Sequence, residues 1–198
     1  KGTAAGYTEF SIWGTGSSGG SVPTAGDATF INLGANTSGA EGGYTTFSGI
    51  STAGHATLVA HGGTNGGYGG RIVFYDHSDG GTATVHLYGN GELDLGDHTG
   101  GLTIETLELH GGIINTQLGT NGTGLTLSGK LVLKSTHATF SFWKKDGRGF
   151  ELNTPYTVLT APNLSDFAEE QFSGNSLDGV EPTFTIVGDQ LRVSFDKK

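Results

Sequence analysis

The sequence predicts an all-β fold, a parallel β-helix (β-solenoid) with a C-terminal capping region that contains a β-hairpin. Three observations lead to this prediction: a segment that repeats, apolar residues that recur at matching positions of the repeats, and an excess of glycine. Glycine supplies 37 of the 198 residues, against an average usage of roughly 7 per cent. Proline is scarce at four residues and no collagen-like period is present, so the glycines indicate tight bends between ordered strands.

The repeat is clearest in two segments, "PTAGDATFINLG" from Pro23 and "STAGHATLVAHG" from Ser51. Each has Thr-Ala-Gly-x-Ala-Thr, a short strand, a polar glycine-rich tract, Gly-Gly and a second strand. The template extends to six turns within residues 1–129, at steps of 18–28 residues. Irregular steps of this size are typical of one supersecondary unit with loops of variable length.

Two columns of the repeat are almost entirely apolar. Because they lie two positions apart on a strand, both columns face the same way. The first column contains Phe10, Phe30, Leu58, Val85, Leu107 and Leu125. The second contains Ile12, Asn32, Ala60, Leu87, Leu109 and Leu127, of which Asn32 is the one polar residue. Stacked turns share such a face as a continuous core, which no single turn could bury.

A second strand in each turn ends in Phe47, Phe74 and Leu95, after glycine corners. The alternative fold is a sandwich or jelly roll of glycine-rich alternating strands. Matched columns over four to six turns are difficult to obtain from antiparallel hairpins, so the sequence favours the solenoid.

The composition changes near Lys130, which divides the chain into glycine-rich solenoid turns at 1–129 and final turns with a cap at 130–198. Only five of the glycines lie in the second part. "LSDFAEEQF" predicts a helical turn with Ser165 as its N-cap. "TFTIVGDQLRVSF" predicts a β-hairpin around Gly188-Asp189. A cap is expected because the last turn of a solenoid exposes unpaired backbone.

The repeats resemble those of bacterial autotransporter passenger domains and related secreted right-handed β-helices. Residues 51–57, "STAGHAT", and 69–74, "GGRIVF", carry the resemblance, and the ending "YTVLTAP…FTIVGDQLRVSF" is similar to the closing segment of such passengers. The resemblance covers most of the chain and concerns structural motifs. It implies a secreted or cell-surface location.

The charge of the chain excludes several partners. Residues 1–129 contain two bases, Lys1 and Arg71, against ten acids. The absence of a basic stripe argues against nucleic acid, and the acidic balance argues against anionic lipid. The sequence contains neither a signal peptide nor an apolar run of membrane-spanning length, so no membrane insertion is expected. It has no cysteine, which excludes thiolate metal sites and disulfides.

The candidate binding surface is a partly aromatic column one residue beyond the inward-facing positions. It contains Trp13, His61, Tyr88 and His110, in line with Leu33. This column either covers strand edges as a solvent-facing stack or presents aromatic faces to a carbohydrate.

Acidic residues at two turns raise the question of metal binding and catalysis. Asp76 and Asp79, and then Asp94 and Asp97, could offer calcium two carboxylates each. Neither turn follows the glycine-rich nonapeptide calcium repeat, and turn formation explains both, so no metal and no cofactor is predicted. A polysaccharide-degrading enzyme is disfavoured because cations are scarce and because these turns are taken to contain the only nearby carboxylate pairs, which turn formation already explains.

The sequence therefore predicts a non-catalytic extracellular structural or adhesive module of a bacterial surface or filament. Its expected partners are copies of itself, joined head to tail, or adjacent passenger sequence. The alternative function is a carbohydrate-binding module that uses the outward aromatic column.

Overall fold

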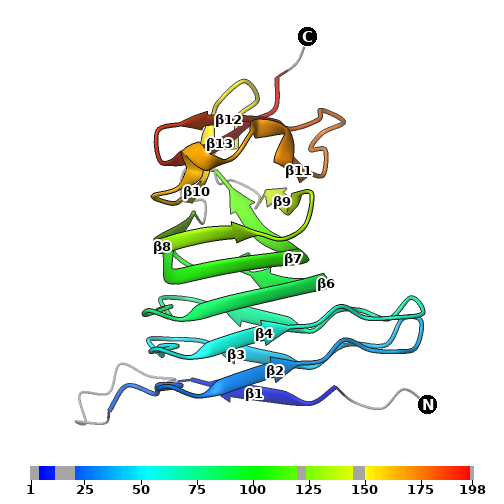
Figure 1. Cartoon of the computed structure of the whole chain (residues 1–198), viewed down its shortest axis with the longest axis vertical. Helices are drawn as coiled ribbons and strands as arrows, with labels where there is room; N and C mark the ends of the chain where they lie inside the picture. The colour runs from blue at the N-terminus through cyan, green and yellow to red at the C-terminus, as the bar shows by residue number, and fades with distance from the viewer. Residues whose placement is uncertain (1–4, 12–20, 120–123, 145–149, 197–198) are drawn as a thin grey trace.

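The computed structural model describes residues 5–11, 21–119, 124–144 and 150–196, and the strands are stacked along its long axis (Figure 1). The fold is all-β: thirteen strands form one hydrogen-bonded sheet that does not close. The strands are β1 (Tyr7–Phe10), β2 (Thr29–Asn32), β3 (Tyr44–Phe47), β4 (Thr57–Ala60), β5 (Arg71–Phe74), β6 (Thr84–Asp94), β7 (Leu102–Leu118), β8 (Leu125–Leu133), β9 (Ala138–Lys144), β10 (Tyr156–Thr160), β11 (Phe172–Gly174), β12 (Thr183–Val187) and β13 (Gln190–Ser194).

One ladder of parallel strands joins β2, β4, β6, β7 and β8. Phe30 lies beside Leu58, Leu58 beside Val85, and Val85 beside Leu107. The last three side chains are fully buried. Parallel pairing and the predicted register are therefore confirmed for this column from Phe30 to Leu107.

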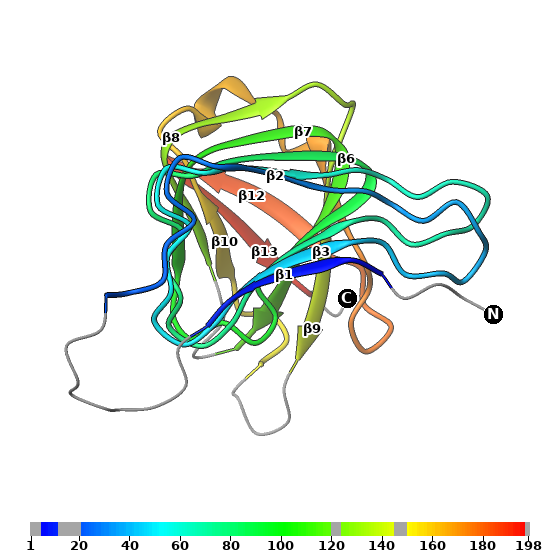
Figure 2. The same cartoon turned by 90° about the horizontal axis from the view of Figure 1, so that it is seen from below.

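A second parallel ladder joins β1, β3, β5 and the second halves of β6 and β7 to β9 and β11. Phe47 and Phe74 stack at a ring-centroid distance of 4.9 Å and are fully buried. The long strands β6 and β7 each contribute to both ladders, which lie on different sides of a common interior (Figure 2).

The C-terminal strands form the other end of the sheet. β10 pairs in parallel with β8 and antiparallel with β13, and β13 forms a hairpin with β12. The turn of this hairpin is Gly188-Asp189, as predicted. Five phenylalanine rings contact one another in this region and close this end of the core: Phe140, Phe142, Phe172, Phe184 and Phe195.

Three parts of the predicted register are wrong. Phe10 pairs with Phe47 and so belongs to the second ladder, because β1 lies beside β3 and not beside β2. Leu125 and Leu127 lie beside Leu102 and Ile104. The two predicted columns continue at Leu131 and Leu133 instead, which lie beside Leu107 and Leu109. β7 and β8 each contain a further inward-facing segment that precedes these residues, and Leu125 and Leu127 belong to it. Ile12 lies outside the described residues.

The predicted helical turn consists of two short 3₁₀ segments, Leu164–Asp166 and Glu169–Gln171. Asn163 precedes the first of them, so Ser165 is not the N-cap. The composition change at Lys130 falls inside β8. Within the described part of the chain, no helix has the length and apolar character that crossing a membrane requires.

The glycine corners stack directly on one another along the molecule. Gly42 contacts the backbone of Gly69, and a Cβ atom at Gly69 would overlap the carbonyl oxygen of Asn90. Two segments, residues 33–43 and 61–70, project together from these corners as an arm (Figure 2), joined by hydrogen bonds such as the one from Ala35 N to Tyr68 O at 2.9 Å.

The first prediction tests this close stacking. We expect Gly69→Ala to lower the free energy of unfolding by about 2–3 kcal/mol, because the new methyl group overpacks a backbone contact that cannot relax. Urea unfolding followed by circular dichroism measures the change. Gly6→Ala is the control, since a Cβ atom there meets no atom within 4 Å. An equal effect of the two substitutions would contradict close stacking at the corners.

Candidate functional site

The structure brings together three of the four residues of the predicted aromatic column. The rings of His61 and Tyr88 stack at 4.9 Å, and those of Tyr88 and His110 at 4.5 Å, with interplanar angles of 21° and 16°. All three side chains are half-buried. Trp13 lies outside the described residues.

This stack limits what the column can bind. Both faces of Tyr88 are covered by the neighbouring imidazoles, so ring edges are what it presents outward. A sugar that binds aromatic rings does so through their faces, which here are engaged with one another. The geometry is that of a stack that covers neighbouring strands.

Glu108 holds the end of the column. His110 Nε2 donates a hydrogen bond to Glu108 Oε1 at 2.5 Å, and His86 Nδ1 lies 3.9 Å from Glu108 Oε2. The hydrogen bond from His110, followed by the electrostatic influence of His86, lowers the pKa of Glu108. The carboxylate therefore stays ionised while it fixes the orientation of His110.

The acidic turns have local structural roles. Asp76 Oδ2 accepts a hydrogen bond from Gly49 N at 3.1 Å, and Asp79 Oδ1 accepts one from Gly81 N, also at 3.1 Å. Asp94 belongs to the buried network described below. No group of three or more His, Asp or Glu side chains in the described residues is placed to hold a metal ion.

A groove that the sequence did not predict lies on the outer face of β1, β3 and β5. Its volume is about 860 Å³. It is lined by aromatic, hydroxyl and charged side chains together with two small apolar residues: Ala5, Tyr7, Glu9, Glu41, Tyr44, Thr46, Ser48, Arg71, Val73, Tyr75 and Asp76. Glu41 comes from the base of the arm, and Asp76 from the turn after β5.

The parallel register builds the groove from alternate residues of its three strands. Tyr7, Tyr44 and Arg71 lie side by side in one row. The rings of Tyr7 and Tyr44 stack at 5.4 Å with an interplanar angle of 12°. The intervening residues point inward, where Phe47 and Phe74 are buried. The alternation that forms the core therefore also forms the outer face.

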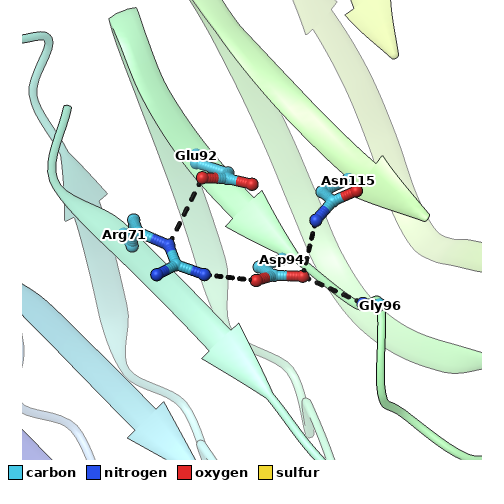
Figure 3. Close-up of polar contacts among 5 residues, drawn as sticks. All are labelled: Arg71, Glu92, Asp94, Gly96 and Asn115. Carbon is cyan, nitrogen blue, oxygen red and sulfur yellow. Dashed lines mark hydrogen bonds and ion pairs between the residues drawn. The ribbon is translucent and has the colours of Figure 1, made fainter. Parts of the chain in front are cut away.

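Arg71, which lines the groove, also belongs to a polar network with residues of neighbouring strands (Figure 3). Arg71 Nη2 lies 2.5 Å from Asp94 Oδ2, and Arg71 Nε lies 3.3 Å from Glu92 Oε2. Asp94 Oδ1 accepts hydrogen bonds from Gly96 N at 2.9 Å and from Asn115 Nδ2 at 3.0 Å. Asp94 is only 6% exposed, and both of its oxygens have partners.

The network shifts the pKa values of Glu92 and Arg71. Burial, followed by the negative charge of Asp94, raises the pKa of Glu92, and the charge of Arg71 only partly opposes this. Hydrogen bonding to Asp94 and the charges of Glu92 and Asp94 raise the pKa of Arg71, although burial, the largest single influence, opposes the rise. Arg71 therefore stays charged and is paired with two acids, while Glu92 gains a proton more readily than an ordinary glutamate does.

The sequence contained a signal for this site that was missed. Glu92 and Asp94 are two residues apart on a strand and thus share a face, but the acid pairs considered were those at turns. The row of Tyr7, Tyr44 and Arg71 forms only when the strands of the second ladder are in register. Because its residues are polar and of mixed type, the apolar pattern that aligned the inward-facing columns could not reveal it.

No protein-family model matches the chain, and no curated protein or solved structure matches it.

The second prediction concerns the Asp94 carboxylate. We expect Asp94→Asn to destabilise the fold by about 2 kcal/mol, because it weakens a charge-assisted hydrogen bond to Arg71 in a buried site. Urea unfolding at neutral pH measures the change. Asp27→Asn, at an exposed turn, is the control, and an equal loss in both variants would show that the network contributes nothing specific.

The third prediction concerns the pH dependence that Glu92 confers. Its raised pKa means that the folded state binds this proton more tightly than the unfolded state. The favourable contribution is therefore present at acidic pH and is lost as the pH rises from about the ordinary value of 4.5 through the folded pKa. We expect the free energy of unfolding of Glu92→Gln to lack this decline in a urea series across pH. The exposed Glu181→Gln should keep it, and a decline that persists in Glu92→Gln would assign it to another group.

Proposed function

We propose that this chain is a non-catalytic structural or adhesive β-solenoid module of a bacterial extracellular surface or filament, and that it associates with copies of itself through its N-terminal edge. The unpaired edge formed by β1 and β2 is the observation that carries this proposal.

The stacking of successive turns supports the solenoid interpretation. Equivalent residues of the turns lie beside one another from Phe30 to Leu107, always in parallel strands. An isolated bridge pattern repeats the same order at Thr24, Thr52 and Asp79. A molecule built in this way is a quasi-one-dimensional rod whose sides and ends have separate roles.

The N-terminal edge offers both backbone and apolar surface. Among the described residues, β1 pairs only with β3 and β2 pairs only with β4. Ile31 and Leu33 are 59% and 64% exposed. A hollow of about 430 Å³ lies between the two strands. Asn32 lines it, and its Nδ2 is buried without a hydrogen-bond partner. An edge of this kind is a template for another strand.

The C-terminal edge is more protected. The outermost strand, β12, is part of an antiparallel hairpin, and Glu169 Oε1 accepts a hydrogen bond from Ile186 N at 2.8 Å. Val187 remains half exposed there and is the apolar contact that this end offers to a second copy. A head-to-tail contact that does not close would generate a filament.

The buried position of Asp94 in the polar network supports a non-catalytic role for that carboxylate. A carboxylate pair that acts on a polysaccharide needs one group free to attack or to activate water. Asp94 is buried with both oxygens hydrogen-bonded, and Arg71 is neutralised by its two acids. The resemblance to secreted passenger domains supports the extracellular location.

The fourth prediction tests association. We expect the mean mass of the purified chain to rise with concentration in multi-angle light scattering, and the double variant Ile31→Lys/Leu33→Lys to remain monomeric, because charges on an edge block strand pairing. Ile50→Lys is the control, since Ile50 is exposed but belongs to the turn after β3 and not to β1 or β2.

The distribution of masses distinguishes the modes of association. A series of increasing oligomers supports head-to-tail assembly, whereas a species that stops at the dimer indicates two N-terminal edges paired with each other. A wild-type chain that stays monomeric at high concentration would overturn self-association.

A further inference from the structure

We propose that the groove on the outer face of β1, β3 and β5 binds a segment of an uncharged glycan chain. This goes beyond the scaffold role and concerns the unassociated chain, because a second copy paired with β1 would cover Tyr7 and compete with the glycan. It also differs from carbohydrate binding by the His61–Tyr88–His110 column, in which both faces of Tyr88 are covered.

The aromatic part of the groove leaves a ring face available. Tyr7 is 64% exposed and stacks on Tyr44 with one face. β1 is the outermost strand of its ladder among the described residues, so no described strand covers the opposite face of Tyr7. An exposed aromatic face suits the C–H surface of a sugar ring, because the π system carries negative charge on its faces.

The polar groups of the groove include donors and acceptors in close alternation. Tyr44, Tyr75 and Thr46 present hydroxyl groups, and Glu9 and Glu41 are exposed carboxylates. Vicinal hydroxyls of a sugar both donate and accept hydrogen bonds, so a mixed lining of this kind can pair with them. A volume of about 860 Å³ lies within the range of roughly 300–1,000 Å³ of small-molecule sites.

One buried hydroxyl gives independent support. Ser48 lines the groove and is 4% exposed, and its Oγ has no hydrogen-bond partner. Buried hydroxyl groups nearly always have a partner. A ligand or a ligand-bound water at the floor of the groove would supply one.

The charge of the groove selects against acidic glycans. Three acids, Glu9, Glu41 and Asp76, line it with a single base. That base, Arg71, is already paired with Glu92 and Asp94. A uronate or sulfate group would face uncompensated negative charge, so the selectivity is for uncharged chains.

The test is calorimetric titration of the chain with three uncharged hexasaccharides: cellohexaose, mannohexaose and laminarihexaose. We expect at least one of them to bind, and Tyr7→Ala and Tyr44→Ala each to weaken that binding at least tenfold. Tyr68→Ala is the matched control, because Tyr68 is exposed on the arm outside the groove. Circular dichroism verifies that each variant is folded, and Glu41→Ala replaces Tyr44→Ala if the latter unfolds.

Four outcomes would overturn the proposal. The first is that none of the three hexasaccharides binds, and the second is that hexagalacturonate binds equally or more tightly, which would contradict the charge argument. The third is that hexalysine binds more tightly with the same dependence on Tyr7, which would make the groove a site for cationic peptides. The fourth is that Tyr88→Ala loses glycan binding while Tyr7→Ala retains it, which would place the site at the column. The double variant at Ile31 and Leu33 should retain glycan binding, so failure here is separable from failure of the association model.

Discussion

The parallel register of successive turns is the constraint on which the rest of the structure depends. A four-residue strand such as β4 cannot satisfy its backbone or bury Leu58 alone, and it gains both only from β2 and β6 on its two sides. The glycine corners exist for the same reason, because Gly42 and Gly69 allow backbones to meet where side chains would separate the turns. Stability is therefore a property of the stack rather than of any turn.

A stack has two ends, and this chain treats them differently. At the C-terminal end, Phe184 and Phe195 pack on the core phenylalanines, and the outermost strand receives a hydrogen-bond acceptor from Glu169. At the N-terminal end, β1 and β2 each have one unpaired edge in the described part of the chain, beside exposed Ile31 and Leu33. The free energy of burying that edge is available to a partner, which is why the association proposal rests there.

The sequence predicted those features that repeat with an apolar signal. Phe30, Leu58, Val85 and Leu107 could be aligned because burial demands an apolar residue at each of their positions. Phe10 was misassigned because the sequence of a short apolar strand does not indicate which ladder the strand joins. Its pairing with Phe47 places it in the second ladder. Asn32 was recognised as an exception without an explanation. Its Oδ1 accepts a hydrogen bond from Thr45, a residue of the other ladder, at 3.0 Å.

The candidate site was less predictable because outward positions are not constrained by the core. Tyr44 and Arg71 occupy outward positions that alternate with inward residues, so the core does not restrict which side chains stand there. They are adjacent because β3 and β5, which belong to different turns, pair with each other. The same freedom explains why the acids of the chain have two separate fates. Asp76 and Asp79 complete turns through backbone N–H groups, whereas Asp94 fixes Arg71 beside an open groove. A scaffold that places side chains at every strand spacing can thus acquire a binding face without any change to its interior.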